Sequence, residues 1–195
     1  MLELVFERVK GMILKPAETF RLAAKDTIPF TLVYYLILLA IFGILFSFAL
    51  SGFNRYMLYN AQFMTSIIVM LGQMIVSLFV GAGWFHLWVY IVGGRQGIVT
   101  TLKVVAYAMT PYLLLGWLIP VGLVAGFIWY LVLVVVGIRE LQQLPTGCAV
   151  LAFALALIVG FIVAFAFLIL IDPNLLSALS DSTPGGSYRS SYSYF

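Results

Sequence analysis

Charged side chains are scarce in this sequence. Asp, Glu, Lys and Arg together make up 9% of its 195 residues, whereas hydrophobic residues make up 64%. A typical soluble domain carries about 25% charged residues. The composition therefore excludes an ordinary soluble domain and indicates a membrane protein. The length allows one compact helical bundle and no second domain.

Cysteine and histidine each occur once, as Cys148 and His86. A single cysteine excludes an internal disulfide and a thiolate metal cluster. The sequence also lacks an HExxH zinc motif, a phosphate-binding loop and a basic patch suited to nucleic acid. We therefore expect no cofactor, no metal ion and no nucleic-acid partner.

Residues 1–28 are amphipathic rather than apolar. Apolar side chains recur there at helical spacing between Glu3, Arg8 and Lys10, and Pro16 stands where a second short helix would begin. Acids and bases are mixed, which is not the pattern of a secretory signal. Three interpretations stay open: helices that cap the bundle from the cytoplasm, helices in the membrane interface, or helices that bind a partner. The first two are compatible.

Five apolar segments follow, and each predicts a transmembrane helix, because about 20 apolar residues cross the core of a bilayer. They cover residues 29–50, 63–92, 104–119, 121–138 and 148–171 of a membrane domain that spans residues 29–172. The predicted fold is an all-α, polytopic five-helix bundle with amphipathic N-terminal helices. Residues 173–195, rich in Ser, Tyr and Gly, form a tail.

The second apolar segment is too long for the membrane. Thirty helical residues extend about 45 Å, whereas the hydrocarbon core is about 30 Å thick. We expect its C-terminal end to project past the bilayer, with Trp84, Trp88 and Tyr90 at the interface. Gly116, Pro120 and Gly122 then separate the third segment from the fourth.

Basic residues indicate the orientation. The N-terminal segment, the loop after the second segment and the loop after the fourth together hold eight of the ten Lys and Arg residues; Arg55 and Arg189 are the others. Cytoplasmic loops carry the excess of Lys and Arg. We therefore expect a cytoplasmic N-terminus and an extracytoplasmic C-terminus in a prokaryotic cell membrane, with an ER or Golgi membrane as the alternative.

The sharpest turn between two apolar segments lies at Gly93–Gly97, because glycines permit positive φ and do not sustain a helix. Lys103 is expected to close this loop. Arg139 and Glu140 are adjacent at the cytoplasmic end of the fourth segment and read most simply as an interfacial charge pair. Candidate interaction or structural residues are therefore Gly93, Gly94, Arg95, Gly97, Pro111, Arg139 and Glu140.

Small residues recur at the four-residue spacing that lets membrane helices approach closely. The candidate helix-packing face comprises Gly122, Gly126, Cys148, Ala152, Ala156, Gly160 and Ala164. Packing within the chain is one interpretation. Contact with a second copy or a membrane partner is the other, for which the long row from Cys148 to Ala164 is the best candidate.

Three polar residues of the second segment are candidates for a polar path. Gln73 and Ser77 are one helical turn apart, and His86 lies among the interfacial aromatics. They either hydrogen-bond between helices or line a polar path together with a kink at Pro111. A Ser–His pair would allow hydrolysis, but no serine has the glycine-flanked setting of an activated nucleophile. Catalysis is therefore not expected.

At this point the residues resemble a known family. Leu14–Phe20 looks like the opening of the prokaryotic branch of the Yip family, the Ypt/Rab GTPase-interacting proteins. Gly93–Gly97, with Val105–Ala108 and Pro111, resembles its central signature, and Gly137–Leu144 resembles its third element. The similarity covers about residues 12–165.

The resemblance implies a five-span helical protein with a cytoplasmic N-terminus and without known catalytic residues. Eukaryotic relatives are linked to small GTPases of vesicle traffic and to membrane shaping. The sequence lacks their long soluble N-terminal region with its Asp-Leu-Tyr-Gly-Pro motif, so a small GTPase is a partner by family resemblance alone.

Three functional hypotheses follow. The first is a non-enzymatic membrane scaffold or accessory subunit that contacts membrane lipids and binds a membrane-protein partner or another copy of itself. The second is a small-solute or ion transporter, or a channel subunit, that uses the polar path around Gln73, Ser77 and His86. The third is an intramembrane hydrolase.

Overall fold

The computed structural model describes residues 1–51, 56 and 60–171, and regular secondary structure in this part of the chain is entirely helical. The helices are α1 (Leu2–Leu14), α2 (Pro16–Ala23), α3 (Ile28–Ser51), α5 (Ala61–Ile91), α6 (Ile98–Ala108), α7 (Thr110–Leu115), α8 (Val121–Leu141) and α9 (Thr146–Ile171). The predicted tail at residues 173–195, and Arg55 and Arg189 of the charge count, lie outside the described residues.

In the described part of the chain, five helical segments are long and apolar enough to cross a membrane. They are α3, α5, α8, α9 and the pair α6–α7, which together run from Ile98 to Leu115. The chain is therefore an all-α, multi-pass membrane protein, as its hydropathy predicts. The longest described helix is α5, whose 31 residues extend roughly 46 Å.

The third span differs from its predicted extent of residues 104–119. It begins with α6 at Ile98 and ends with α7 at Leu115. Lys103 therefore lies inside the helix rather than closing the loop, and its ammonium group donates to the backbone oxygen of Ala24 at 2.9 Å. Pro111 stands in the first turn of α7, where its missing N–H costs nothing, and the helix is interrupted just before it at Met109.

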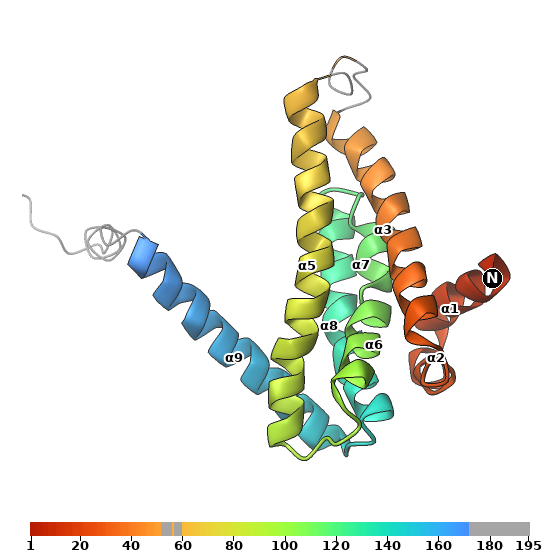
Figure 1. Cartoon of the computed structure of the whole chain (residues 1–195), viewed down its shortest axis with the longest axis vertical. Helices are drawn as coiled ribbons and strands as arrows, with labels where there is room; N and C mark the ends of the chain where they lie inside the picture. The colour runs from red at the N-terminus through yellow and green to blue at the C-terminus, as the bar shows by residue number, and fades with distance from the viewer. Residues whose placement is uncertain (52–55, 57–59, 172–195) are drawn as a thin grey trace, which may run out of the picture. The chain divides into compact units, whose positions relative to one another are not determined.

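Helix α8 has three close neighbours (Figure 1). It packs against α7, α6 and α2, while α5 packs on α6, and α3 packs on α6 and α7. The approach of α7 to α8 requires Gly126, because a Cβ atom there would lie 3.0 Å from the Pro111 carbonyl oxygen and 3.0 Å from the Tyr112 Cα. This glycine of the predicted packing face thus acts within the chain.

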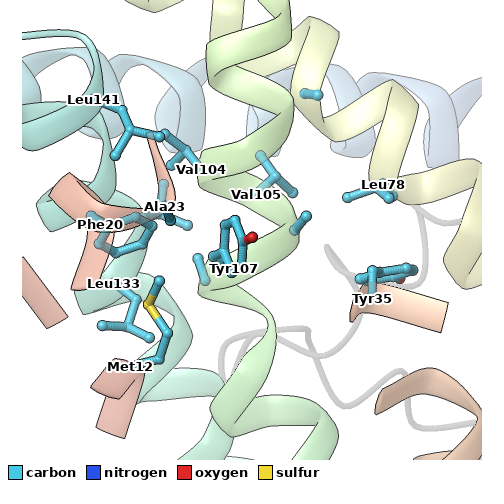
Figure 2. Close-up of a cluster of buried hydrophobic side chains, with 14 of the residues drawn as sticks. Met12, Phe20, Ala23, Tyr35, Leu78, Val104, Val105, Tyr107, Leu133 and Leu141 are labelled. Carbon is cyan, nitrogen blue, oxygen red and sulfur yellow. The ribbon is translucent and has the colours of Figure 1, made fainter. Parts of the chain in front are cut away.

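The two N-terminal helices cover one side of the bundle. Met12 and Phe20 are buried in the same core as Tyr107 and Leu133 (Figure 2). A Cβ atom at Gly137 of α8 would lie 2.9 Å from the Phe20 ring, so the glycine makes room for α2.

Another side of α1 is apolar and exposed. Leu2 is 70% exposed and Phe6 is 68% exposed, although both lie on a helix whose Val5 and Met12 are buried. One helix therefore packs on the bundle and still presents apolar side chains outward, which is the arrangement of helices that lie in a membrane interface.

The chain divides into two units, residues 1–156 and 157–195. Within the first unit, Ala149, Ala152 and Ala156 at the start of α9 are buried. In the second unit, the described residues 157–171 continue α9 and expose large apolar side chains such as Phe161 and Leu170.

Candidate functional site

The candidate site is the loop between α5 and α6, and its two flanking glycines shape it. Gly93 has φ +104° and Gly97 has φ +82°, a region that side chains other than glycine rarely adopt. Helix α5 ends at Ile91 because the chain turns at Gly93, and α6 starts directly after Gly97. The turn is thus fixed by backbone conformation, at the residues that carry the family resemblance.

Gly94 is required for a different reason, because a larger side chain would not fit at its position. It is buried, and an added Cβ atom would overlap the Val89 side chain and lie 3.2 Å from Gln142 Oε1. The Gly94 amide donates to the Val89 carbonyl oxygen at 2.8 Å, which folds the loop back onto α5. The loop is therefore packed against the bundle rather than standing free in solvent.

Gln142, which follows α8, connects the two loops at this end of the bundle. Its side chain is buried, with Nε2 donating to Thr101 Oγ1 at 2.9 Å and to the Gly97 carbonyl oxygen at 3.3 Å. Its Oε1 accepts from the Gln96 backbone N–H at 3.1 Å. One buried amide thus holds the α5–α6 loop against the α8–α9 loop.

Sequence reasoning gave Gln142 no role. The only available signal was its place in the Gly137–Leu144 element that resembles the family, and a glutamine beside a loop is ordinarily solvated. Its partners are 41 to 46 residues away in the sequence, so no local pattern reports the contact.

His86 belongs to the same hydrogen-bond network. Its Nδ1 lies 2.9 Å from Thr101 Oγ1, the hydroxyl that also accepts from Gln142. His86, Thr101 and Gln142 therefore connect α5, α6 and the end of α8 in one chain of contacts. Ser66 and Ser77, two serines of the same helix as His86, donate to carbonyl oxygens of that helix.

Arg95 is the exposed cation of the loop, and it is held in place. Its Nη1 donates to the Tyr90 carbonyl oxygen at 2.7 Å, and its guanidinium carbon lies 4.0 Å from the centre of the Tyr90 ring. A cation over an aromatic face is attracted by the quadrupole of the ring. The guanidinium group is consequently oriented before any partner binds.

Glu140 joins two arginines rather than the one predicted. The structure brings Arg139 Nη2 to 2.5 Å from Glu140 Oε1, and it adds Arg21 of α2, whose Nε lies 2.6 Å from Glu140 Oε2. The Glu140 side chain is only 8% exposed. The cluster therefore ties the N-terminal helices to the end of α8.

A second ion pair lies between α1 and the residues that precede α3. Arg8 Nε and Nη2 donate to the two oxygens of Asp26, each at 3.0 Å, and the Tyr107 hydroxyl donates to Asp26 Oδ2 at 2.5 Å. The hydrogen bonding of Arg8 to the Asp26 carboxylate is the main reason that the pKa of Arg8 is raised, so its guanidinium stays charged. Sequence reasoning gave these residues no joint role.

The three residues of the predicted polar path occupy separate surfaces. Gln73 is exposed in a groove of about 600 Å³. Ser77 lines a crevice of about 250 Å³ together with Tyr112 and Tyr130. His86 bonds to Thr101 in the network described above. The described residues do not bring Gln73, Ser77 and His86 together.

The predicted packing row on α9 is partly buried and partly exposed. Ala152 and Ala156 are buried, and the Ala156 carbonyl oxygen accepts from Trp84 Nε1 at 3.0 Å, so this part of the row packs on α5. Cys148 is half-buried, and Ala164, in the second unit, is exposed. Within residues 1–51, 56 and 60–171, no three His, Cys, Asp or Glu side chains are grouped so that they could hold a metal ion.

These features define a class: an integral membrane protein of apolar helices in which hydrogen bonds hold two loops together at one end of the bundle. A family model, the Yip1 domain, matches residues 10–168 of the chain. The chain therefore belongs to the Yip family, as its motifs indicated. Searches of the curated proteins and of the solved structures found no match.

Proposed function

We propose that the protein is a non-enzymatic membrane scaffold or accessory subunit, and that it binds a membrane partner or another copy of itself. The observation that carries the proposal is the Gln142 contact, which joins the α5–α6 loop and the α8–α9 loop into one fixed surface. A surface that is ordered before binding loses less conformational entropy when a partner arrives.

We define the loop surface as Arg95, Gln96 and Gln143. All three are exposed, and Gln96 Nε2 donates to Gln143 Oε1 at 3.4 Å. The oriented guanidinium of Arg95 suits a carboxylate on the partner, since arginine pairs with carboxylates through two parallel hydrogen bonds. The neighbouring amides supply further donors and acceptors. A membrane-associated protein segment with an acidic side chain fits this chemistry best.

Contacts between the basic segments support the proposed orientation. Arg21 of the N-terminal segment reaches Glu140 at the end of α8, and Lys103 of α6 reaches Ala24. The segments that hold most of the basic residues therefore meet at one end of the bundle. By the distribution of Lys and Arg, we propose that this end is cytoplasmic.

The same observations favour a scaffold over the two alternatives. A transporter built on Gln73, Ser77 and His86 needs a continuous polar path, whereas these residues line different surfaces. A hydrolase needs a serine beside the histidine, whereas the hydroxyl bonded to His86 belongs to Thr101. The hydrogen bonds of His86 and Gln142 instead hold the loop backbone and the helices in place.

The proposal is tested by placing a photoreactive amino acid at Gln96, with the same amino acid at Lys10 as the control. Irradiation of native membranes should yield a defined covalent adduct from Gln96 and not from Lys10, and Arg95→Glu should reduce that adduct severalfold. Lys10→Glu, which also reverses one exposed charge, should leave it unchanged. A protein that forms no adduct from Gln96, and that purifies alone as a strict monomer, would contradict the scaffold function.

A further inference from the structure

The outward side of α5 is unlike the lipid-facing surface of a membrane helix. Ile67, Leu78 and Phe85 are buried against the bundle, and on the opposite side of the same helix the side chains are exposed. That exposed side carries the polar residues Gln62, Thr65, Ser66 and Gln73. They line a groove of about 600 Å³ together with Val69 and Met70. We call this surface the α5 polar face.

Two side chains of the α5 polar face have no hydrogen-bond partner among the described residues. Thr65 and Ser66 donate to carbonyl oxygens of α5 itself. In contrast, the side-chain amides of Gln62 and Gln73 make no hydrogen bond within the described part of the chain. Each primary amide offers two donors and one acceptor, so both have unused capacity.

Gln73 lies too far from the end of α5 for bulk water to hydrogen-bond its side-chain amide. It is twelve residues from Ala61, or about 18 Å along a helix of roughly 46 Å. Hydrocarbon offers no hydrogen bonds, and polar residues of transmembrane helices almost always face other protein or a water-filled cavity. The exposed position of Gln73 therefore indicates that something polar covers it in the membrane.

The spacing of the α5 polar face shows what kind of element fits. Gln62, Ser66, Val69, Gln73, Val76 and Val80 are separated alternately by four and three residues, and all six are exposed. This spacing of seven residues per two turns matches two helices that cross at about 20° and interdigitate along a left-handed seam. The neighbouring exposed residues Ile68, Ile75 and Phe79 are larger and apolar, as expected for contact with lipid.

We propose that a second copy of this chain covers the α5 polar face, so that two α5 helices pair in parallel about an axis normal to the membrane. Glutamine is both donor and acceptor, so Gln73 can pair with Gln73 of a two-fold-related copy. In contrast, the described residues 157–171 at the end of α9 are entirely apolar and cannot bond to a glutamine amide. The inference rests on the proposed scaffold function and specifies its self-association.

Cysteine crosslinking in native membranes tests the pairing. In a Cys148→Ala background, Ser66→Cys, Val69→Cys and Val76→Cys each place one thiol on the seam. Ile68→Cys and Ile75→Cys place it at matching depth on the lipid side. A disulfide requires Cα atoms about 4.4–6.8 Å apart. Under mild oxidation we expect disulfide-linked dimers from the three seam variants and at least severalfold fewer from the two controls.

Substitution of Gln73 tests the hydrogen bond itself. In the Val69→Cys background, Gln73→Leu should lower the dimer association constant about 3- to 30-fold, the range of measured interhelical hydrogen bonds. Gln73→Asn keeps the amide and should retain part of the dimer. Because Gln73 is exposed and makes no described side-chain hydrogen bond, neither change should alter folding of the single chain.

Several results would overturn the inference. Equal crosslinking at Ile68 and Val69 would show random collision. A fast reaction of Ser66→Cys with a membrane-impermeant thiol reagent would show a water-lined path. A crosslink within one chain, between Val69→Cys and Val163→Cys, would show that α9 covers the face. Because the Gln96 photoadduct is measured at the far end of α5, it can persist when the seam fails, so the two proposals fail separately.

Discussion

Arg8 of α1 and Asp26, which precedes α3, form a two-point ion pair with both hydrogen bonds at 3.0 Å and side chains only 11% and 7% exposed. Tyr107 of α6 donates to the same carboxylate. Three segments of the chain therefore meet at one carboxyl group. The pair fixes the N-terminal helices on the bundle, because neither charge has a second oppositely charged partner among the described ion pairs.

Removing one member of this pair should destabilise the fold strongly. Asp26→Asn or Arg8→Ala leaves the other charge uncompensated in a buried position, which typically costs about 3–5 kcal/mol. Thermal unfolding in mild detergent measures the loss. Lys10→Ala on the same helix is the control, and its change should stay within about 0.5 kcal/mol.

The double variant Arg8→Met/Asp26→Leu should be more stable than either single variant, because it leaves no buried charge unpaired. Unfolding temperatures close to wild type for both single variants would show that water, rather than the partner residue, compensates each charge.

The Gln142 contact predicts a local effect on the loop surface. Gln142→Ala removes the hydrogen bonds to Gln96, Gly97 and Thr101, each of which contributes about 0.5–1.5 kcal/mol to holding the two loops together. Hydrogen exchange at the Gln96 amide should accelerate by at least tenfold, while exchange in the middle of α8 stays slow.

Gln96→Ala is the matched control for this experiment, because it removes only an exposed side-chain contact and keeps the backbone N–H that Gln142 accepts. If exchange at position 96 is as fast in the wild type as in Gln142→Ala, the loops are not held together in solution.

Gly94 and Gly147 should respond in opposite ways to a larger side chain. A Cβ atom at Gly94 overlaps Val89, so Gly94→Val should reduce the yield of folded protein. Gly147 lies in the first turn of α9 with no atom within 4 Å of an added Cβ, so Gly147→Ala should be neutral or slightly stabilising. The monodisperse fraction after detergent extraction compares them directly, and equal yields would mean that the loop can move away from Val89.

Sequence reasoning predicted an all-helical protein with several apolar spans, because hydropathy and helix length are properties of contiguous residues. The turn at Gly93–Gly97 was predictable for the same reason. The start of α6 at Ile98 was missed, because the charge of Lys103 indicated a loop, whereas the long side chain reaches Ala24 from inside the helix.

The contacts that build the candidate site were beyond local reasoning. Arg21 and Glu140 are 119 residues apart, and Tyr107 and Asp26 are 81 residues apart. No periodicity within one segment relates such residues, because their pairing depends on how helices pack in three dimensions. The same holds for Gln73, whose position on the outward side of α5 follows only from knowing which side of the helix packs on the bundle.

Gly126 and Gly81 give the last test, which separates packing inside the chain from association between chains. A Cβ atom at Gly126 would press on backbone atoms of Pro111 and Tyr112, which cannot rotate away as a side chain could. Gly126→Ala should therefore push α7 from α8 and lower the unfolding temperature by several degrees, for a cost of about 1–3 kcal/mol. Gly81→Ala on α5 meets no atom within 4 Å and should leave the unfolding temperature unchanged or raise it.

Unfolding should be followed at two protein concentrations, since a loss confined to the single chain does not depend on concentration whereas a lost dimer contact does. A Gly126→Ala defect that disappears at high concentration would place this glycine at an interface between copies instead of between α7 and α8.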